Sequence, residues 1–375
     1  MVPNHICRRV GKAVQERIDA LKIGQKMQDL PVHLWHESFR FYVKEDPTRC
    51  GGPNLRLIRL DPKKPSLTVT GYIYNKFVHP YENRFITVRE AARLQGFPDD
   101  FIFQGSLTST QLQVGNAVPV PLGRAVFNQI LSHAVENNPH QICSRIYAKN
   151  KKIPAISLFS GAGGLDIAAD YSSRGEFHLS TKAAIEFDND CCETLRKNFS
   201  KNLKVFECDI RNVDPLETLR GVRGRIGVFP LVYGGPPCQA FSQAGKQKGV
   251  LDERGTLVFE FLRFIEAIKP IYFFMENVSG IKSVEGGKLI KKILLKMNDI
   301  GYEITHGVLC AADYGAPQLR NRYIFLGVQK GFPSLEMPTP THCVKSEDNA
   351  LFDTLNSYVG VGEAFKGLPK IANDQ

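Results

Sequence analysis

The chain has 375 residues, 43% hydrophobic and 23% charged, which is typical of a globular protein with one or two domains. Its net charge of +10 at pH 7 favours an anionic partner such as a nucleic acid. No apolar run approaches the roughly 18–20 residues of a membrane span, no secretory signal opens the chain, and the nine cysteines form no CxxC pair, so we expect a cytoplasmic protein without membrane or metal.

The first 80 residues show little periodicity and are interrupted by Pro62, Pro65 and Pro80. Residues 1–60 contain eleven Lys and Arg against six Asp and Glu, whereas residues 331–375 contain three against six. A basic segment suits contact with a phosphate backbone, although a merely solvated basic surface has the same composition. The sequence predicts a second lobe made from both chain ends, comprising residues 1–105 and completed by 346–375.

Residues 106–345 alternate between strand and helix after a first helix over 121–135 and a polar linker over 136–152. Strands are expected at 154–159, 182–187, 204–207, 228–233, 271–275, 303–309 and 322–328, and helices at 164–172, 189–199, 255–268 and 285–299. Short apolar runs between amphipathic segments are typical of a largely parallel sheet covered on both faces. We therefore expect an α/β domain with a doubly wound, Rossmann-like sheet.

A cysteine follows one of these strands. The apolar run 228–233 leads into Gly-Gly-Pro-Pro-Cys-Gln-Ala-Phe-Ser over 234–242, so Cys238 lies on a turn stiffened by two prolines. Open α/β sheets bind their ligands at this end of the strands. Glu276 also follows a strand, and Gln-Leu-Arg-Asn-Arg over 318–322 precedes one. Each feature alone has a structural explanation, but their recurrence at strand ends favours a single site.

A glycine-rich turn, Phe-Ser-Gly-Ala-Gly-Gly-Leu over 159–165, follows the first strand. The dinucleotide fingerprint requires a third glycine where this chain has Asp166, which argues against a bound pyrophosphate. The second strand ends in Glu186, which can take both ribose hydroxyls, and Asp209-Ile210 at the end of the third can hold an adenine edge. This set favours a nucleoside cofactor such as S-adenosylmethionine, with a generic strand–turn–helix as the structural alternative.

Several segments resemble the motifs of the cytosine-5 DNA methyltransferases. They span roughly residues 60–330 and comprise the Phe-Ser-Gly-Ala-Gly-Gly turn, Pro-Pro-Cys-Gln, Asp-Glu-Arg-Gly-Thr-Leu at 252–257, Glu-Asn-Val at 276–278, Gln-x-Arg-x-Arg, Arg-Glu-Ala-Ala-Arg-Leu-Gln-Gly-Phe-Pro at 89–98 and Gln-Val-Gly-Asn-Ala-Val at 113–118. In the family the last two segments come last, whereas here they come first. The chain thus resembles a circularly permuted member of the bacterial restriction–modification type, and permutation succeeds at exposed loops where the parent termini lie close together.

The resemblance implies transfer of a methyl group from S-adenosylmethionine to carbon 5 of a cytosine flipped out of the duplex. Cys238 would add to carbon 6 of the ring, and Glu276 would hold ring nitrogen 3 and the exocyclic amine. Arg322 would bind the carbonyl oxygen, while Arg320 would order the site or a phosphate. The expected cofactor-binding residues are Phe159, Gly161, Gly163, Gly164, Leu165, Glu186, Asp209, Ile210, Pro237, Leu257, Asn116 and Val118. The expected DNA-binding residues are Gln239, Ser242 and Arg89.

We expect a monomeric enzyme of a bacterial or archaeal cell, associated with the nucleoid, with double-stranded DNA as substrate and a cognate restriction endonuclease as a candidate partner. Four other functions are alternatives for this sequence: an RNA methyltransferase, a DNA-binding protein without catalysis, a nicotinamide-dependent dehydrogenase, and a half-enzyme that needs a recognition subunit. The missing glycine argues against the dehydrogenase, and the presence of every expected catalytic side chain argues against lost catalysis. The segment around Arg89 favours DNA over RNA as the substrate. The recognition region is short, so a half-enzyme that needs a recognition subunit stays an alternative.

Overall fold

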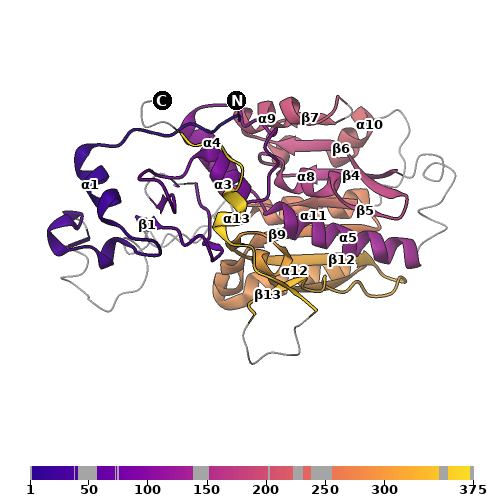
Figure 1. Cartoon of the computed structure of the whole chain (residues 1–375). Helices are drawn as coiled ribbons and strands as arrows, with labels where there is room; N and C mark the ends of the chain where they lie inside the picture. Colours follow the sequence, from indigo (N-terminus) through magenta and orange to yellow (C-terminus); the bar gives the residue numbers. More distant parts are fainter. Residues whose placement is uncertain are drawn as a thin grey trace. The chain divides into compact units, whose positions relative to one another are not determined.

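The computed structural model describes residues 2–37, 39–40, 57–71, 73, 76–137, 152–201, 203–222, 231–237, 256–345 and 354–371. The chain divides into two compact units (Figure 1). The first unit comprises Met1–Asn116, Gly315–Arg320 and Thr341–Gln375, and the second comprises Ala117–Tyr314 and Asn321–Pro340. These bounds reflect which residues contact one another, whereas the domains expected from the sequence were defined by function. The assignment of catalysis and DNA recognition to particular domains therefore stays a prediction.

The second unit is built on an eight-stranded sheet (Figure 1). Its strands are β4 (Lys152–Leu158), β5 (Ser173–Arg174), β6 (Phe177–Glu186), β7 (Lys204–Glu207), β8 (Leu231–Gly234), β9 (Tyr272–Val278), β10 (Tyr302–Cys310) and β12 (Asn321–Gln329). They are ordered β10-β12-β9-β8-β4-β6-β5, and β7 also pairs with β6. The pairs β7–β6, β6–β4, β4–β8 and β8–β9 are parallel, while β12 is antiparallel to both of its neighbours. The predicted doubly wound, largely parallel sheet is confirmed.

Strand β4 lies at the point where the strand order reverses, with β6 on one side and β8 on the other. The register aligns one residue of each of four parallel strands in a row, namely Leu158, Ile185, Gly234 and Met275. The residues that follow this row therefore lie at the same edge of the sheet, and they include Glu186 and Glu276. Ligands of open α/β sheets bind outside the carboxyl ends of the strands at such a reversal point.

Helices cover both faces of the sheet. They are α5 (Val120–Asn137), α8 (Gly164–Asp170), α9 (Asn189–Asn198), α10 (Pro215–Val222), α11 (Thr256–Ile268) and α12 (Lys288–Asp299), with 3₁₀ turns η5 (Ile210–Asn212), η6 (Ser279–Gly287) and η7 (Ala311–Tyr314). On one face the ring of Phe127 in α5 lies 5.3 Å from that of Phe274, and on the other Phe261 in α11 lies 6.2 Å from Phe273. Consecutive strand residues point to opposite faces, so β9 is buried on both sides. The predicted helices are confirmed, whereas α10 was missed.

Strands β4 and β8 approach closely at Gly234, where an added Cβ would lie 2.1 Å from the carbonyl oxygen of Leu158. We expect Gly234→Ala to lower the free energy of unfolding by about 1–3 kcal/mol, because the paired strands would have to move apart. Urea unfolding measures this change. The matched control is Gly280→Ala, where no atom lies within 4 Å of the added Cβ. Equal losses in the two variants would contradict the prediction.

The first unit consists of short elements around a small core. Its helices are α1 (Lys12–Ala20), α3 (Val88–Leu94), α4 (Leu107–Asn116) and α13 (Val361–Phe365), with 3₁₀ turns η1 (Met27–Asp29) and η2 (Val32–Leu34). Its strands form three parallel pairs: β1 (Ile58–Arg59) with β3 (Phe77–Val78), β2 (Ser66–Leu67) with β11 (Gln318–Leu319), and β13 (His342–Cys343) with β14 (Asn356–Ser357). Segments from near the two ends of the chain meet in this unit, since a ring nitrogen of His5 lies 2.9 Å from the carbonyl oxygen of Pro369.

Candidate active site

The glycine-rich turn after β4 has open space on one side and dense packing on the other. Gly161 and Gly163 have φ angles of +54° and +88°, in the region that favours glycine. A Cβ on Gly163 would lie 2.7 Å from the ring of Phe199, and a Cβ on Gly164 would lie 2.8 Å from the carbonyl oxygen of Val118. An added Cβ on Gly161 would meet no atom within 4 Å. The turn can therefore accept a ligand that approaches its backbone at Gly161.

Glu186 ends strand β6 and faces this turn. Its carboxylate accepts a hydrogen bond of 2.7 Å from the N–H of Gly161 and bonds of 2.9 Å from the N–H groups of Phe187 and Asp188. Burial raises the pKa of Glu186, and these three hydrogen bonds partly offset that effect. Each carboxylate oxygen has more than one acceptor site, so the bonds are compatible with ribose hydroxyls as additional donors. Glu186 also fixes the glycine turn, a role that sequence reasoning missed.

The remaining expected cofactor ligands have varied surroundings. Asp209 caps η5 and forms an ion pair of 2.6 Å with Arg211, whose hydrogen bonds lower the pKa of Asp209. Arg211 was not predicted, although its spacing two residues after Asp209 is a usable signal. Ile210 and Leu165 are buried, Phe159 and Leu257 are partly buried against the core of the second unit, and Asn116 belongs to the first unit.

The turn that leads into Cys238 is held by the Glu-Asn-Val segment at the end of β9. A Cβ on Gly235 would lie 2.9 Å from Oε2 of Glu276, so a side chain at position 235 would displace this carboxylate from the turn. The side-chain amide of Asn277 donates a buried hydrogen bond of 3.0 Å to the carbonyl oxygen of Pro236. Asn277 is thus a further residue that shapes the site. Pro237 is half-buried at the end of this described segment, whereas Cys238, Gln239 and Ser242 lie outside the described residues.

Glu276 and Arg322 form a largely buried ion pair on adjacent strands. Nε of Arg322 lies 2.6 Å from Oε1 of Glu276, and the two side chains are 11% and 10% exposed. Burial lowers the pKa of Arg322, and the carboxylate of Glu276 counteracts this shift. The pair offers guanidinium donors beside a carboxylate. A ring with a carbonyl oxygen next to N–H donors, such as a pyrimidine, is complementary to this arrangement.

Arg320 belongs to the first unit and is 1% exposed. Its guanidinium donates hydrogen bonds of 2.5 Å and 2.9 Å to the carbonyl oxygens of Val69 and Gly115. These contacts join β11 to two other segments of that unit. They give Arg320 a structural function, and its predicted contribution to catalysis stays a prediction.

Arg89 is also buried, with 0% exposure, and this geometry argues against the expected DNA contact. Its guanidinium donates to the carbonyl oxygens of Pro3, Pro98 and Phe101. Burial lowers its pKa to about 10. A guanidinium surrounded by backbone carbonyls connects loops and is inaccessible to a phosphate. The sequence places Arg89 in the first turn of a helix but does not reveal that its side chain is buried.

We expect Arg89→Met to lower the free energy of unfolding by roughly 2–4 kcal/mol, because three buried carbonyls lose a charged donor. Thermal unfolding measures this effect, and Arg8→Met at an exposed position is the matched control. A stable Arg89→Met variant with a weaker salt dependence of DNA binding would restore the DNA-contact assignment.

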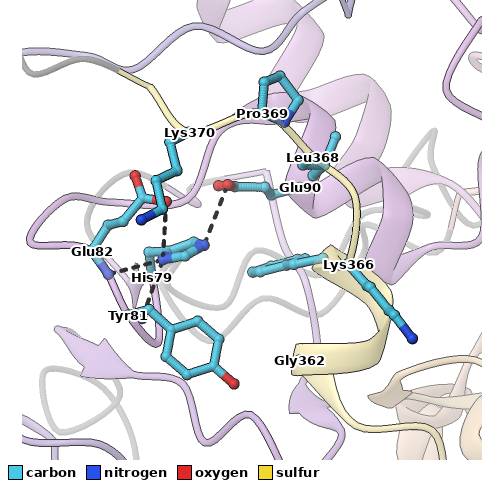
Figure 2. Close-up of a pocket in the computed structure, with 10 residues that line it drawn as sticks. His79, Tyr81, Glu82, Glu90, Gly362, Lys366, Leu368, Pro369 and Lys370 are labelled. Carbon is cyan, nitrogen blue, oxygen red and sulfur yellow. Dashed lines mark hydrogen bonds and ion pairs between the residues drawn. The ribbon is translucent and has the colours of Figure 1, made fainter.

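The first unit has a pocket of about 380 Å³ (Figure 2). Its lining includes His79, which stacks on Phe365 with ring centroids 5.4 Å apart, and Glu90, which Arg84 binds through both oxygens at 2.7 and 2.8 Å. Burial lowers the pKa of His79 to about 4, and its Nδ1 accepts hydrogen bonds from the backbone of Tyr81 and Glu82. The pocket lies where α13 packs on α3, and its walls carry paired charges.

Among the described residues, no group of three His, Cys, Asp or Glu side chains is arranged to hold a metal ion. No helix in that part of the chain combines the length and apolarity needed to cross a membrane.

Comparison with known proteins identifies the class. The family model of C-5 cytosine-specific DNA methylases matches residues 13–132 and 153–367. The chain therefore belongs to this family, and its class is that of the DNA cytosine-5-methyltransferases.

Individual relatives match parts of the chain. The Type II methyltransferase M.AquIA of Picosynechococcus sp. is 38% identical over 57% of this chain and 88% of its own length. The Type II methyltransferase M.NgoFVII of Neisseria gonorrhoeae is 34% identical over 62% of this chain and 57% of its own length. A crystal structure of a putative DNA modification methyltransferase from an E. coli prophage aligns at 30% identity, with a TM-score of 0.46, over 58% of this chain and 56% of that one. The chain thus spans little more than half the length of some relatives.

Proposed function

We propose that this protein is a site-specific DNA (cytosine-5-)-methyltransferase that uses S-adenosylmethionine and acts in a restriction–modification system. The observation that carries the proposal is the Glu276–Arg322 pair beside Gly235, on the turn that leads into Cys238. This carboxyl group and guanidinium, together with the thiol that follows the turn in the sequence, would supply what activation of a cytosine ring requires. The relatives named Type II methyltransferases support the biological setting.

In this proposal the thiolate of Cys238 adds to carbon 6 of a flipped cytosine, since carbon 5 of the free ring is too electron-poor to be methylated. Glu276 in its protonated state gives a proton to ring nitrogen 3, and Arg322 donates hydrogen bonds to the carbonyl oxygen. Carbon 5 then forms a bond to the methyl group, whose bond to the cofactor's sulfur would break with the electron pair left on sulfur. Loss of the carbon 5 proton to a base restores the ring double bond and releases the Cys238 thiolate, and ring nitrogen 3 returns its proton to Glu276.

The glycine turn fits a nucleoside cofactor, because Gly161 leaves its backbone open and Glu186 lies beside it. When bound, S-adenosylmethionine supplies the methyl group as a sulfonium electrophile. Phe159, Glu186 and Asp209 would hold its adenosine part, and Leu257, Asn116 and Val118 would line the remainder. Gln239 and Ser242 would lie on the loop that closes over the flipped base.

We also propose that the chain is circularly permuted relative to the usual motif order of its family. The two family segments around Arg89 and Asn116 precede the glycine turn, in reverse of the family order. Segments from near both ends meet in one unit, where His5 contacts Pro369 and Arg93 donates to the carbonyl oxygens of Ala364 and Lys366. Residues 1–105 with 346–375 would form the recognition lobe of a monomeric cytoplasmic enzyme that acts on double-stranded DNA.

The test is methyl transfer from labelled S-adenosylmethionine by the purified chain, with unmethylated bacteriophage DNA and bulk tRNA offered separately. Label at carbon 5 of cytosine within one short DNA motif, located by bisulfite sequencing, is the expected result. Label only in tRNA would overturn the DNA assignment. Bound cofactor without transfer to either would show that the chain alone is not the complete enzyme.

A further inference from the structure

A buried chain of hydrogen bonds joins three residues of the second unit, on elements that border the candidate cofactor site. The hydroxyl of Tyr233 donates a bond of 2.9 Å to Oδ1 of Asp166, and Oγ1 of Thr181 lies 2.7 Å from the same hydroxyl. Asp166 and Tyr233 are 0% exposed and Thr181 is 8% exposed. Because Tyr233 gives its one hydrogen to Asp166, Thr181 is the donor in the second bond.

The three residues come from three elements that border the candidate site. Asp166 lies in α8, which starts at the glycine turn, and Thr181 lies in β6, which ends at Glu186. Tyr233 lies in β8, immediately before the Gly-Gly-Pro-Pro turn that leads to Cys238. The hydrogen bonds therefore connect the three elements from which the glycine turn, Glu186 and the turn before Cys238 extend.

Asp166 has the environment of a neutral carboxylic acid. Within the described part of the chain its Oδ2 has no hydrogen-bond partner. Tyr233 donates to its Oδ1. Ser157 of β4 acts with Tyr233 to lower the pKa of Asp166, while Asp170, one turn further along α8, adds a like charge that raises it. The nearby Lys152 of β4 and Lys182 of β6 act on Asp170. Burial raises the pKa of Asp166 to about 7, because an unpaired charge in this position is costly.

We propose that Asp166 is a positioning residue of the cofactor site, which in its neutral form holds the glycine turn in place through the hydroxyl of Tyr233. This inference rests on the proposed use of S-adenosylmethionine. Asp166 occupies the position where a dinucleotide-binding turn has its third glycine, and its presence argues against a bound pyrophosphate. The inference gives the same residue a function in binding a different cofactor.

The sign of the pH effect follows from the raised pKa. A buried acid whose pKa is higher in the folded than in the unfolded protein stabilises the fold at low pH, and this contribution is lost as the pH rises through about 7. If only the neutral form holds the turn in its binding geometry, cofactor affinity falls by about tenfold between pH 6 and pH 8.

The experiment is calorimetric titration of the full chain with S-adenosylmethionine from pH 6 to 8.5. Wild type is compared with Asp166→Asn, which stays neutral, and with Asp166→Leu, which removes the acceptor. Titration of the cofactor's own amine is common to all variants and cancels in the comparison. We expect Asp166→Asn to bind as wild type does at pH 6 and to lose the additional tenfold fall by pH 8, whereas Asp166→Leu binds more weakly throughout.

Tyr233→Phe provides a second test if the Asp166 variants do not fold. The inferred contact runs through this hydroxyl. Its removal should therefore weaken binding at pH 6 and abolish the tenfold fall in affinity between pH 6 and pH 8. Identical pH profiles in wild type, Asp166→Asn and Tyr233→Phe would overturn the inference, even if melting temperatures change. If wild type binds no S-adenosylmethionine at any pH, the proposed function itself fails, and this outcome is distinct from a pH-independent affinity.

Discussion

Cys238→Ala is expected to abolish methyl transfer and to leave the affinity for S-adenosylmethionine nearly unchanged. Without the thiolate, no group adds to carbon 6, and carbon 5 of the cytosine cannot attack a methyl group. The residues expected to hold the adenosine part of the cofactor, Phe159, Glu186 and Asp209, follow β4, β6 and β7 rather than β8. Transfer of labelled methyl to DNA and equilibrium binding of the cofactor measure the two effects separately.

The control is Cys343→Ala, which changes a half-buried cysteine of the first unit. It should retain transfer at the wild-type rate. Full activity in Cys238→Ala would remove this cysteine from the mechanism, and a parallel loss of cofactor binding would assign it a structural function instead.

Glu276→Gln is expected to reduce turnover by about 10²–10⁴-fold, the usual contribution of a positioned general acid. The amide keeps the shape of the side chain beside Gly235 but cannot give a proton to ring nitrogen 3. It also leaves Arg322 buried without its countercharge, so the variant should lose roughly 3–5 kcal/mol of stability. Single-turnover transfer, measured well below the melting temperature, separates the two effects.

The matched control for Glu276→Gln is Glu303→Gln, which neutralises an exposed carboxylate on β10. Its turnover and stability should equal those of wild type. Wild-type turnover in folded Glu276→Gln would contradict the assigned function of Glu276.

The sheet was predictable because its strands are apolar runs separated by amphipathic helices, a pattern that buried parallel strands require. The same logic placed Glu186 and Glu276 at strand ends, and the register confirms that they share one edge of the sheet. Helix α1 was missed because Ile18 is its one buried residue, which leaves almost no apolar periodicity to detect.

Other features depend on contacts that no local pattern reveals. Arg89 was expected on a DNA-facing surface, yet its guanidinium is enclosed by three backbone carbonyls from two separate segments, one at Pro3 and one at Pro98 and Phe101. Asn277 was part of a noticed motif, but its hydrogen bond to Pro236 joins residues 41 positions apart. In the same way, Asp166 was noted only as a missing glycine, since the position of Tyr233 behind it follows from the packing of α8 on the sheet.

The most direct test of the central claim, covalent catalysis by Cys238, uses DNA in which the target cytosine carries fluorine at carbon 5. After thiolate addition and methyl transfer, carbon 5 has no proton to lose, so the bond between Sγ and carbon 6 persists. We predict a denaturant-stable protein–DNA complex that forms only with cofactor present, maps to Cys238 by peptide mass spectrometry, and is absent in Cys238→Ala. Methylation of ordinary DNA without any such complex on the fluorinated substrate, or an adduct that persists in Cys238→Ala, would contradict the account.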